Sequence, residues 1–395
     1  MDEAISSVPM NNLIQSGHTV LFRLLNGETR GLKVDHGSAV SLGRLGSFPA
    51  NALIGQRYGL THEIQGKELN ILPPRVLQEV EDTDATNELI TDGELVQPLT
   101  ITEIEALKQS GAHAADIIKA QIEQHANYEL KTEYSKEKYK RRKEAKYMKA
   151  FTTVEPTLHN VCEYWFKKDH NRIRDLRPDT LSQMLNLGSI RPGGRYLAVD
   201  DASGLVISAV LHRLGGEGRL ISICDVDSPP AYPVMAQMNF AKDIIAPLGT
   251  LNWATAQPDY APAAPQEESS SGEPRSDRHR QRLDRRKLAN DALQQTRNEL
   301  FSGEFDGLLV STEYDAFEVV QTLSPYLAGS ACIVVQHPYQ QPLTELQMKM
   351  RAIPSYLGPS ITESWSRRYQ VLPGRTHPMM STSGTGGFLL HAIKV

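Results

Sequence analysis

Nine lysine and arginine residues fall within residues 131–149, against three acidic residues, and Tyr134, Tyr139 and Tyr147 lie among them. The whole chain has a formal net charge of −5, so this cluster does not follow from a basic overall composition. Cationic side chains neutralise phosphates, and flat rings stack on bases. The combination therefore favours contact with a nucleic acid.

The same segment is also a good helix former, and most Lys/Glu-rich helices are solvated surface. Charge is expected on every side of this helix, which leaves no apolar stripe for packing. A helix of this kind bridges domains, binds a partner, or is not stable alone. We expect contact with RNA phosphates from Lys131, Lys136, Lys138, Lys140, Arg141, Arg142, Lys143 and Lys146.

A second place for chemistry is the turn after residues 195–199, where an α/β domain that binds a nucleoside cofactor carries a Gly-rich loop. Glycines there let the backbone approach the ligand, but this turn has only one, and Leu205 and Val206 add side chains. We interpret it as a degenerate cofactor loop that binds no cofactor, formed by Asp200, Asp201, Ala202, Ser203 and Gly204. Asp225 and Asp227 follow the next strand, where an acidic residue would hold a ribose, and are interpreted as ordinary strand-end residues.

Other catalytic patterns are missing from the sequence. It contains no G-x-S-x-G and no Walker A motif, so no catalytic residue is predicted. Cys162, Cys224 and Cys332 are scattered without metal-ligand spacing, which predicts a metal-free chain from a reducing compartment. No apolar run approaches the roughly 18 residues of a membrane span, so no membrane association is expected.

These segments must be positioned by the elements around them. Residues 16–75 predict short strands at 18–25, 32–34, 39–42, 52–54 and 68–72, with a hairpin turn at Asn26-Gly27. Many short strands with Gly-containing turns favour a small β-barrel or sandwich for residues 1–75. Residues 76–150 follow as an acidic linker, an amphipathic helix capped by Thr102 and Glu105, and the basic segment.

From residue 151 the pattern alternates between strands and helices, which predicts a doubly wound α/β sheet for residues 151–395. Strands are expected at 195–199, 220–224, 251–254, 307–310 and 331–336, with Val371 and residues 388–395 as a final antiparallel pair. Residues 257–290 are Pro/Ala/Ser-rich and then Arg-rich. They are expected to form a disordered insert whose basic end starts a helix.

Three segments carry a resemblance to a known family. They are residues 130–147, the turn at 200–206 with Arg213-Leu-Gly-Gly216, and residues 368–380 with Gly386-Gly-Phe-Leu-Leu390. Over almost its whole length the chain resembles the non-catalytic, RNA-binding subunit of the eukaryotic tRNA (adenine-58-N1)-methyltransferase. The resemblance implies an N-terminal barrel followed by a class I methyltransferase-like, Rossmann-like domain.

The resemblance also implies partners. These are tRNA and a paralogous catalytic subunit that binds S-adenosylmethionine, in a heterotetramer with two copies of each chain, located in the nucleus. Residues 305–310 run into Ser311-Thr312-Glu313 without the Asp-Leu-Pro pattern of that catalytic paralogue. Further RNA contacts are expected from Arg367, Arg368, Arg375 and His377. These residues are equally compatible with structuring an edge hairpin or a subunit interface.

Two other functions remain open at this point. The chain could be an active S-adenosylmethionine-dependent RNA methyltransferase with an unusual cofactor loop, or an RNA-binding translation or assembly factor without a methylation partner. Binding of S-adenosylmethionine by the isolated chain separates the first from a silent subunit, and co-purification of a methyltransferase paralogue argues against the second.

Overall fold

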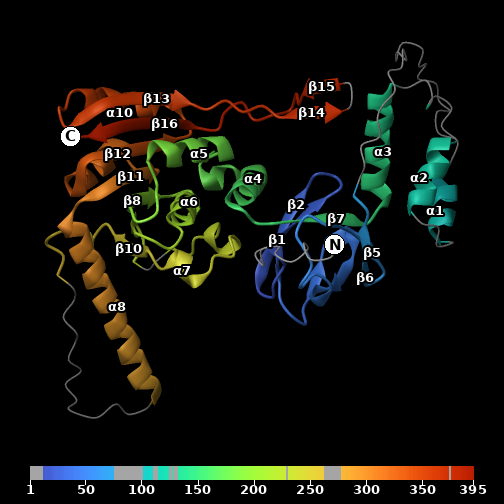
Figure 1. Ribbon diagram of the computed structural model, residues 1–395, viewed down its shortest axis with the longest axis horizontal. Coiled ribbons are helices and arrows are strands. Elements are labelled where there is room, and N and C mark those ends of the chain that lie inside the picture. The colour runs from blue at the N-terminus through green and yellow to red at the C-terminus, as the bar shows by residue number, and fades with distance from the viewer. Residues whose placement is uncertain are drawn as a thin grey trace, which may run out of the picture. The chain divides into compact units, whose positions relative to one another are not determined.

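The computed structural model describes residues 12–74, 101–109, 114–123, 128, 132–227, 230–261, 277–372 and 375–395. The chain divides into two compact units, shown as ribbons in Figure 1. The first unit comprises residues 1–156 and 367–382, and the second comprises residues 157–366 and 383–395. The predicted linker at 76–100 lies outside the described residues.

The first unit is built on an antiparallel sheet of five strands in the order β2-β1-β7-β5-β6. Its strands are β1 (His18–Leu24), β2 (Thr29–Val34), β5 (Thr61–Gln65), β6 (Glu68–Leu72) and β7 (Ala150–Val154). A separate two-stranded ribbon pairs β3 (Ala39–Ser41) with β4 (Ser47–Pro49). The predicted Asn26-Gly27 turn closes the β1–β2 hairpin, with Gly27 at φ +87°.

The core of this unit is aromatic. Phe151 packs against Phe22 and Phe48, with ring centroids 5.3 Å apart in both pairs, and all three side chains are buried. Because Phe151 lies on β7, residues 150–154 complete a sheet that begins at residue 18. Residues 50–52, part of which was predicted as a strand, form a short 3-10 helix instead.

The predicted small β-barrel is not confirmed. Among the described residues β2 and β6 are the edges of an open sheet, and no ladder joins them. Short strands with glycine turns occur in open sheets as well as in barrels, and closure requires pairing between the two edge strands. No local pattern in the sequence specifies that pairing.

Two further groups of elements belong to the first unit. Between β6 and β7 lie three helices, α1 (Ile101–Gln109), α2 (Ala114–Glu123) and α3 (Glu133–Tyr147), where one amphipathic helix and a basic segment were predicted. The hairpin of β14 (Tyr369–Leu372) and β15 (Arg375–Pro378) forms the second.

The second unit is a seven-stranded mixed sheet in the order β10-β9-β8-β11-β12-β16-β13. Its strands are β8 (Arg195–Asp200), β9 (Arg219–Cys224), β10 (Leu248–Asn252), β11 (Phe305–Ser311), β12 (Leu327–His337), β13 (Tyr356–Glu363) and β16 (Phe388–Lys394). The first five run parallel, and β16 is antiparallel to both of its neighbours. This confirms the predicted doubly wound α/β sheet.

Helices cover both faces of this sheet, as expected for strands buried on both sides. Alternate residues of the strands, such as Leu197, Val199 and Val310, join a core with α8 (Asp277–Ser302), α9 (Ala316–Leu323) and α10 (Gln340–Arg351). The other face carries α4 (Leu158–Asp169), α5 (Pro178–Leu187) and α6 (Leu205–Leu214), and α7 (Lys242–Ile245) contacts α6.

Two details of the second unit differ from the sequence prediction. Val371 pairs within the β14–β15 hairpin, and the antiparallel neighbours of β16 are β12 and β13. The third strand, β10, begins three residues earlier than predicted. The basic end of the predicted insert starts a helix as expected, since residues 277–290 form the first half of α8, and residues 262–276 lie outside the described residues.

The aromatic core predicts that Phe151→Ala lowers the free energy of unfolding of the first unit by about 3–5 kcal/mol, because it leaves a cavity between two sheet neighbours. Ile71→Ala is the matched control, since its side chain is 52% exposed on the same sheet. Hydrogen exchange of the β1 and β5 amides under native conditions measures both effects. Equal effects of the two substitutions would contradict this core.

Candidate functional site: a closed cofactor crevice and a basic helix

The strand order of the second unit reverses between β8 and β11. From β8 the chain adds β9 and β10 on one side of the sheet, and it then adds β11 on the other side of β8. In open α/β sheets, ligands bind beyond the carboxyl ends of the strands at this switch point. Here the carboxyl ends are Asp200 on β8 and Ser311 on β11. The predicted degenerate loop therefore lies at the position where a cofactor would bind.

The buried carboxylate of Asp200 stabilises this turn through hydrogen bonds to its backbone. Its carboxylate accepts hydrogen bonds from the backbone N–H groups of Ala202 at 2.7 Å and Ile207 at 2.9 Å. Burial raises the pKa of Asp200 to about 6, although these two backbone donors act in the opposite direction. The side chain joins the end of β8 to the start of α6.

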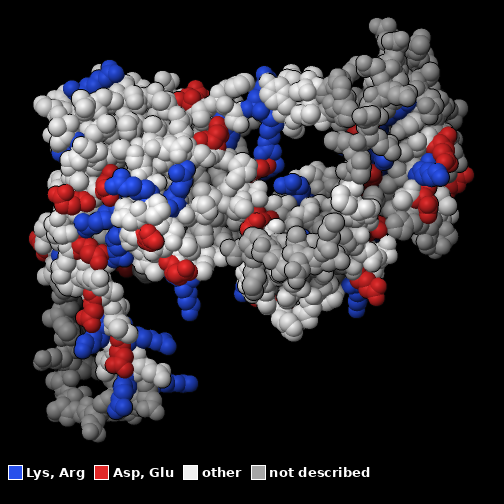
Figure 2. Space-filling view, in the orientation of Figure 1, with Lys and Arg blue, Asp and Glu red and all other residues white. Residues whose placement is uncertain are grey.

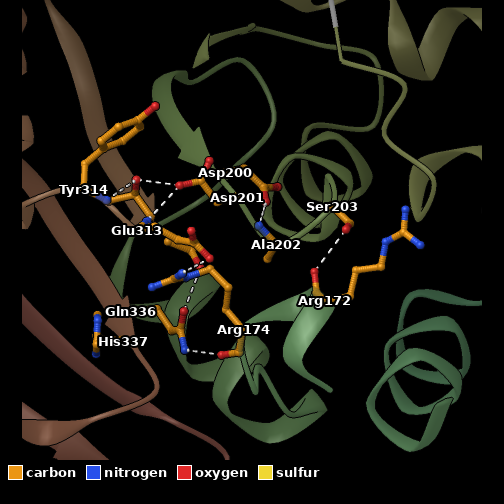
Figure 3. A network of polar contacts seen from close by, with 12 residues as sticks. Arg172, Arg174, Asp200, Asp201, Ala202, Ser203, Glu313, Tyr314, Gln336 and His337 are labelled. Atoms are coloured by element: carbon orange, nitrogen blue, oxygen red, sulfur yellow. Dashed lines mark hydrogen bonds and ion pairs between the residues drawn. The ribbon is translucent and has the colours of Figure 1, made fainter. Parts of the chain in front are cut away.

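Asp201 joins β8 to β11 (Figure 3). Its backbone N–H donates to the carbonyl of Ser311 at 2.8 Å. Its carboxylate accepts from the Thr312 hydroxyl at 2.7 Å and from the Glu313 backbone N–H at 2.9 Å. Both strand ends are thus tied across the switch point by one residue.

Arg174 contributes a cation to the same crevice. It has a left-handed backbone (φ 53°), its side chain is 8% exposed, and its Nη1 lies 3.3 Å from a Glu313 carboxylate oxygen. Its carbonyl accepts from the Gln336 amide at 2.9 Å, and the Gln336 oxygen accepts from the Ser311 hydroxyl at 2.6 Å. Burial lowers the pKa of Arg174, and the carboxylates of Glu313 and Asp201 oppose that shift.

The glycine of the turn is also closed in. Gly204 has φ +83°, and a Cβ built on it would lie 2.7 Å from Tyr232. Tyr232 is itself buried, and its hydroxyl is 3.0 Å from the Ser222 hydroxyl. Ala202 and Leu205 are fully buried, so their side chains belong to the core of the unit.

A nucleoside cofactor does not fit this arrangement. The carboxylates of Asp200 and Asp201 are engaged by the protein itself, Arg174 occupies the crevice, and Tyr232 covers the only glycine of the turn. Ser203 donates its hydroxyl to the Arg172 carbonyl at 3.0 Å (Figure 3). Of the two strand-end aspartates, Asp227 accepts from the Asn252 amide at 3.2 Å, and Asp225 is exposed.

The basic segment forms α3, which begins where the Thr132 hydroxyl accepts from the Ser135 backbone N–H at 3.3 Å. The side chains of Lys138, Lys140, Arg141, Arg142 and Lys146 are exposed. Lys136 and Lys143 are partly buried, and Lys131 lies outside the described residues. Arg141 also forms an ion pair with Glu137 at 2.8 Å, one turn earlier.

Two tyrosines of α3, Tyr139 and Tyr147, pack against the protein. The amide of Gln121 on α2 donates to the Tyr147 hydroxyl at 3.2 Å, and Gln121 is buried. Tyr139 meets Tyr128 edge to face at 6.0 Å, and the Lys143 ammonium lies 5.0 Å from the Tyr139 ring centroid. Although no apolar stripe was predicted, α3 therefore packs on α2 with its rings and presents its cations.

The further RNA contacts predicted from the sequence lie on the β14–β15 hairpin and just before it. Arg367, Arg368 and His377 have exposed side chains, and Arg375 is the first residue of β15. The Arg368 carbonyl accepts from the Met379 backbone N–H at 2.9 Å, which continues the hairpin pairing. The hairpin and α3 belong to the same unit.

The sequence analysis missed the residues that close the crevice. Arg174, Tyr232 and Gln336 lie 26 or more residues from the turn in the chain and are brought to it only by the fold. Among the described residues, no group of His, Cys, Asp and Glu is arranged to hold a metal ion. In the same set, no helix has the length and apolar composition needed to cross a bilayer.

Comparison with known proteins assigns the chain to a family. The family model described as the Gcd10p family matches residues 13–287. The chain is 29% identical to the "tRNA (adenine(58)-N(1))-methyltransferase non-catalytic subunit trm6" of Schizosaccharomyces pombe, over 97% of this chain and 92% of that protein. It is 27% identical to the TRM6 protein of the same description from Mus musculus, over 88% of this chain and 82% of that protein.

Among solved structures, the chain is similar to a SAM-dependent O-methyltransferase from Thermotoga maritima, with a TM-score of 0.56 and 10% identity. The match covers 98% of this chain and 96% of that chain. At this identity the similarity establishes the fold alone, and it agrees with the predicted class I methyltransferase-like domain.

The buried carboxyl of Asp200 makes stability depend on pH. Its pKa is about 6 in the folded protein against an ordinary value of 3.8. The folded state therefore binds more protons than the unfolded chain between these values, so this group lowers the free energy of unfolding as the pH rises through them. Asp200→Asn removes that contribution and should flatten the pH dependence across this window.

Denaturant unfolding of both proteins across the window measures this difference in slope. The absolute stability of Asp200→Asn also falls, because an amide group faces a backbone donor, and only the slope is compared. Asp259→Asn, an exposed aspartate in the same unit, is the control. Parallel curves for wild type and Asp200→Asn would rule out the raised pKa.

Proposed function

Because the chain belongs to the Gcd10p family, we propose that it is the non-catalytic, RNA-binding subunit of a tRNA (adenine-58-N1)-methyltransferase. The observation that carries this proposal is the crevice at the sheet switch point, which the protein fills with its own side chains. Relatives that match nearly the whole chain bear the name of a non-catalytic subunit, and the closed crevice is a physical basis for that description.

We propose that S-adenosylmethionine binds to the partner subunit and not to this chain. In support of this proposal, the carboxylates of Asp200 and Asp201 accept hydrogen bonds from the protein itself, and Arg174 is buried beside Glu313. The partner is then a paralogous chain with an intact Gly-rich loop, in a heterotetramer with two copies of each subunit. Nuclear localisation belongs to the same proposal and is checked by immunofluorescence of the tagged protein.

The RNA-binding part of the proposal rests on α3. A buried base in folded tRNA can be reached only if the enzyme grips a large polyanion and exposes one nucleotide. Phosphate contacts dominate such affinity, and the exposed cations of α3 can provide them. Since Tyr139 and Tyr147 pack against neighbouring protein residues, we expect these two rings not to stack on bases and α3 to bind phosphates through its cations.

We propose that the exposed residues of the β14–β15 hairpin make additional contacts with the tRNA phosphates. Arg367, Arg368 and His377 are exposed, which phosphate contact requires. A role in contacting the catalytic subunit also fits an exposed hairpin. Substituting these residues and measuring tRNA binding separately from subunit assembly distinguishes the two roles.

Reversing the charge of Lys140 and Arg142 together, by Lys140→Glu and Arg142→Glu, should weaken tRNA binding without unfolding the protein. Both side chains are exposed on α3. If about four to six phosphates are neutralised in the wild type, log affinity against log salt has a slope near −3 to −5, and this variant should make it shallower by about 1.5 to 2. Filter binding of a tRNA transcript at several salt concentrations measures both quantities.

The matched control is Lys33→Glu with Lys67→Glu, which reverses two exposed charges on the sheet of the same unit. The control should lose less affinity than the α3 variant. An α3 variant that binds like wild type would remove α3 from the interface.

Labelled S-adenosylmethionine should not bind to the isolated chain, and the isolated chain should not methylate tRNA. Both activities should be present when the catalytic paralogue is co-expressed. Equilibrium dialysis and a tRNA methylation assay, each with and without the partner, measure this. Tight cofactor binding by this chain alone would identify it as an active methyltransferase, and full tRNA binding without any such partner would favour a separate RNA-binding factor.

A further inference from the structure

Helix α8 is anchored at one end only. In its C-terminal half the Glu299 carboxylate forms an ion pair with Arg219 at 2.5 Å, and Leu300 is buried. The buried guanidinium of Arg297 donates to the carbonyls of Thr255 and of Gln257, the latter at 3.1 Å. These contacts fix the direction in which the rest of the helix leaves the second unit.

The N-terminal half of α8 has no packed face. The side chains at position 278 and at positions 280–292 are all exposed, and the helix extends away from the sheet of its own unit (Figure 1). A helix that is polar on all sides gains little stability from burial, so its side chains require another explanation. Leu283 and Leu288 are 48% and 68% exposed, and helical geometry separates them by about 140°, so they form no apolar stripe.

The charges on this half are sorted by face. At about 100° per residue, Arg278, Arg282, Arg285 and Arg286 lie within an arc of about 100°. Asp284 and Asp291 are seven residues apart and lie within about 20° of each other on the opposite side. Arg280 and Lys287 are the remaining cations, and they lie beside this acidic row.

The four clustered arginines are not neutralised within the described part of the chain, where no ion pair involves them. Arg280 and Lys287 form no ion pair within the described residues either, but each lies one helical turn from an aspartate, Asp284 and Asp291 respectively. Figure 2 shows Lys and Arg side chains projecting outward along this helix. The arginine face is therefore exposed and carries one sign of charge, and the C-terminal half of α8 anchors it to the second unit.

We propose that the face of α8 formed by Arg278, Arg282, Arg285 and Arg286 is a second docking surface for the sugar–phosphate backbone of RNA. Guanidinium groups match phosphate oxygens with two parallel donors, which favours arginine over lysine at such contacts. This face offers no apolar or aromatic side chain to bury against a protein, and its single sign of charge is complementary to a polyanion.

This inference rests on the proposed function, because it assigns a second grip on the same class of ligand. The two grips differ in place and chemistry. Helix α3 belongs to the first unit and carries mostly lysines among tyrosines, whereas α8 belongs to the second unit and carries arginines on one face. Each can be altered without touching the other.

The test compares two variants of the full-length chain that remove the same charge from the same helix. Arg282→Gln with Arg285→Gln alters the arginine face, and Arg280→Gln with Lys287→Gln alters the mixed face. All four side chains are exposed, so both variants should keep the circular dichroism and melting temperature of the wild type. The probe is a tRNA transcript, and binding is measured over a range of salt concentrations.

The arginine-face variant should bind several-fold more weakly, and its salt slope should be shallower by about 1.5, the value for two lost phosphate contacts. The mixed-face variant should change less in both quantities. Equal losses would mean that net charge alone matters and would overturn the inference, as would wild-type binding by the arginine-face variant. The α3 variant measured in parallel separates the outcomes: if only α3 matters, this inference fails while the proposed function stands, and if neither matters, both fail.

Discussion

The second unit depends on the way Asp200 and Asp201 hold the carboxyl ends of two neighbouring strands. Asp201 ties β8 to β11 through its backbone and its carboxylate, while Asp200 ties β8 to the first turn of α6. In a doubly wound sheet this junction is where strands diverge and ligands enter. Here the polar groups of the junction form hydrogen bonds with one another, and these bonds join the two strand ends.

The contacts of this junction are the physical basis for the proposal that this chain binds no cofactor. A carboxylate that accepts two or three protein hydrogen bonds has little capacity left for a ligand. A buried guanidinium would have to be displaced, with the loss of its carboxylate neighbours, before a ligand could enter. Under this proposal, a chain can give up the cofactor and still keep its sheet and the surfaces that the sheet carries.

The sequence predicted the elements that depend on local chemistry. Asn26-Gly27 predicted a hairpin, and residues 195–199 and 220–224 predicted two buried strands. The single glycine at position 204 was the reason for interpreting the turn as degenerate. What it could not predict depends on distant partners. Tertiary contacts decide whether β2 pairs with β6 to close a barrel and whether Tyr139 points inward. They also bring Tyr232 to Gly204 and Arg174 to Glu313.

The place of β7 in the first unit has a consequence for how the chain is made on the ribosome. The hairpins β1–β2 and β5–β6 lie on either side of β7, and among the described strands no ladder joins β1 to β5 directly. Both hairpins are synthesised long before residues 150–154 leave the exit tunnel, so their inner edges stay unpaired during that interval. Unpaired edges are prone to association with other chains, and this nascent chain should therefore be most dependent on chaperones before its middle third is complete.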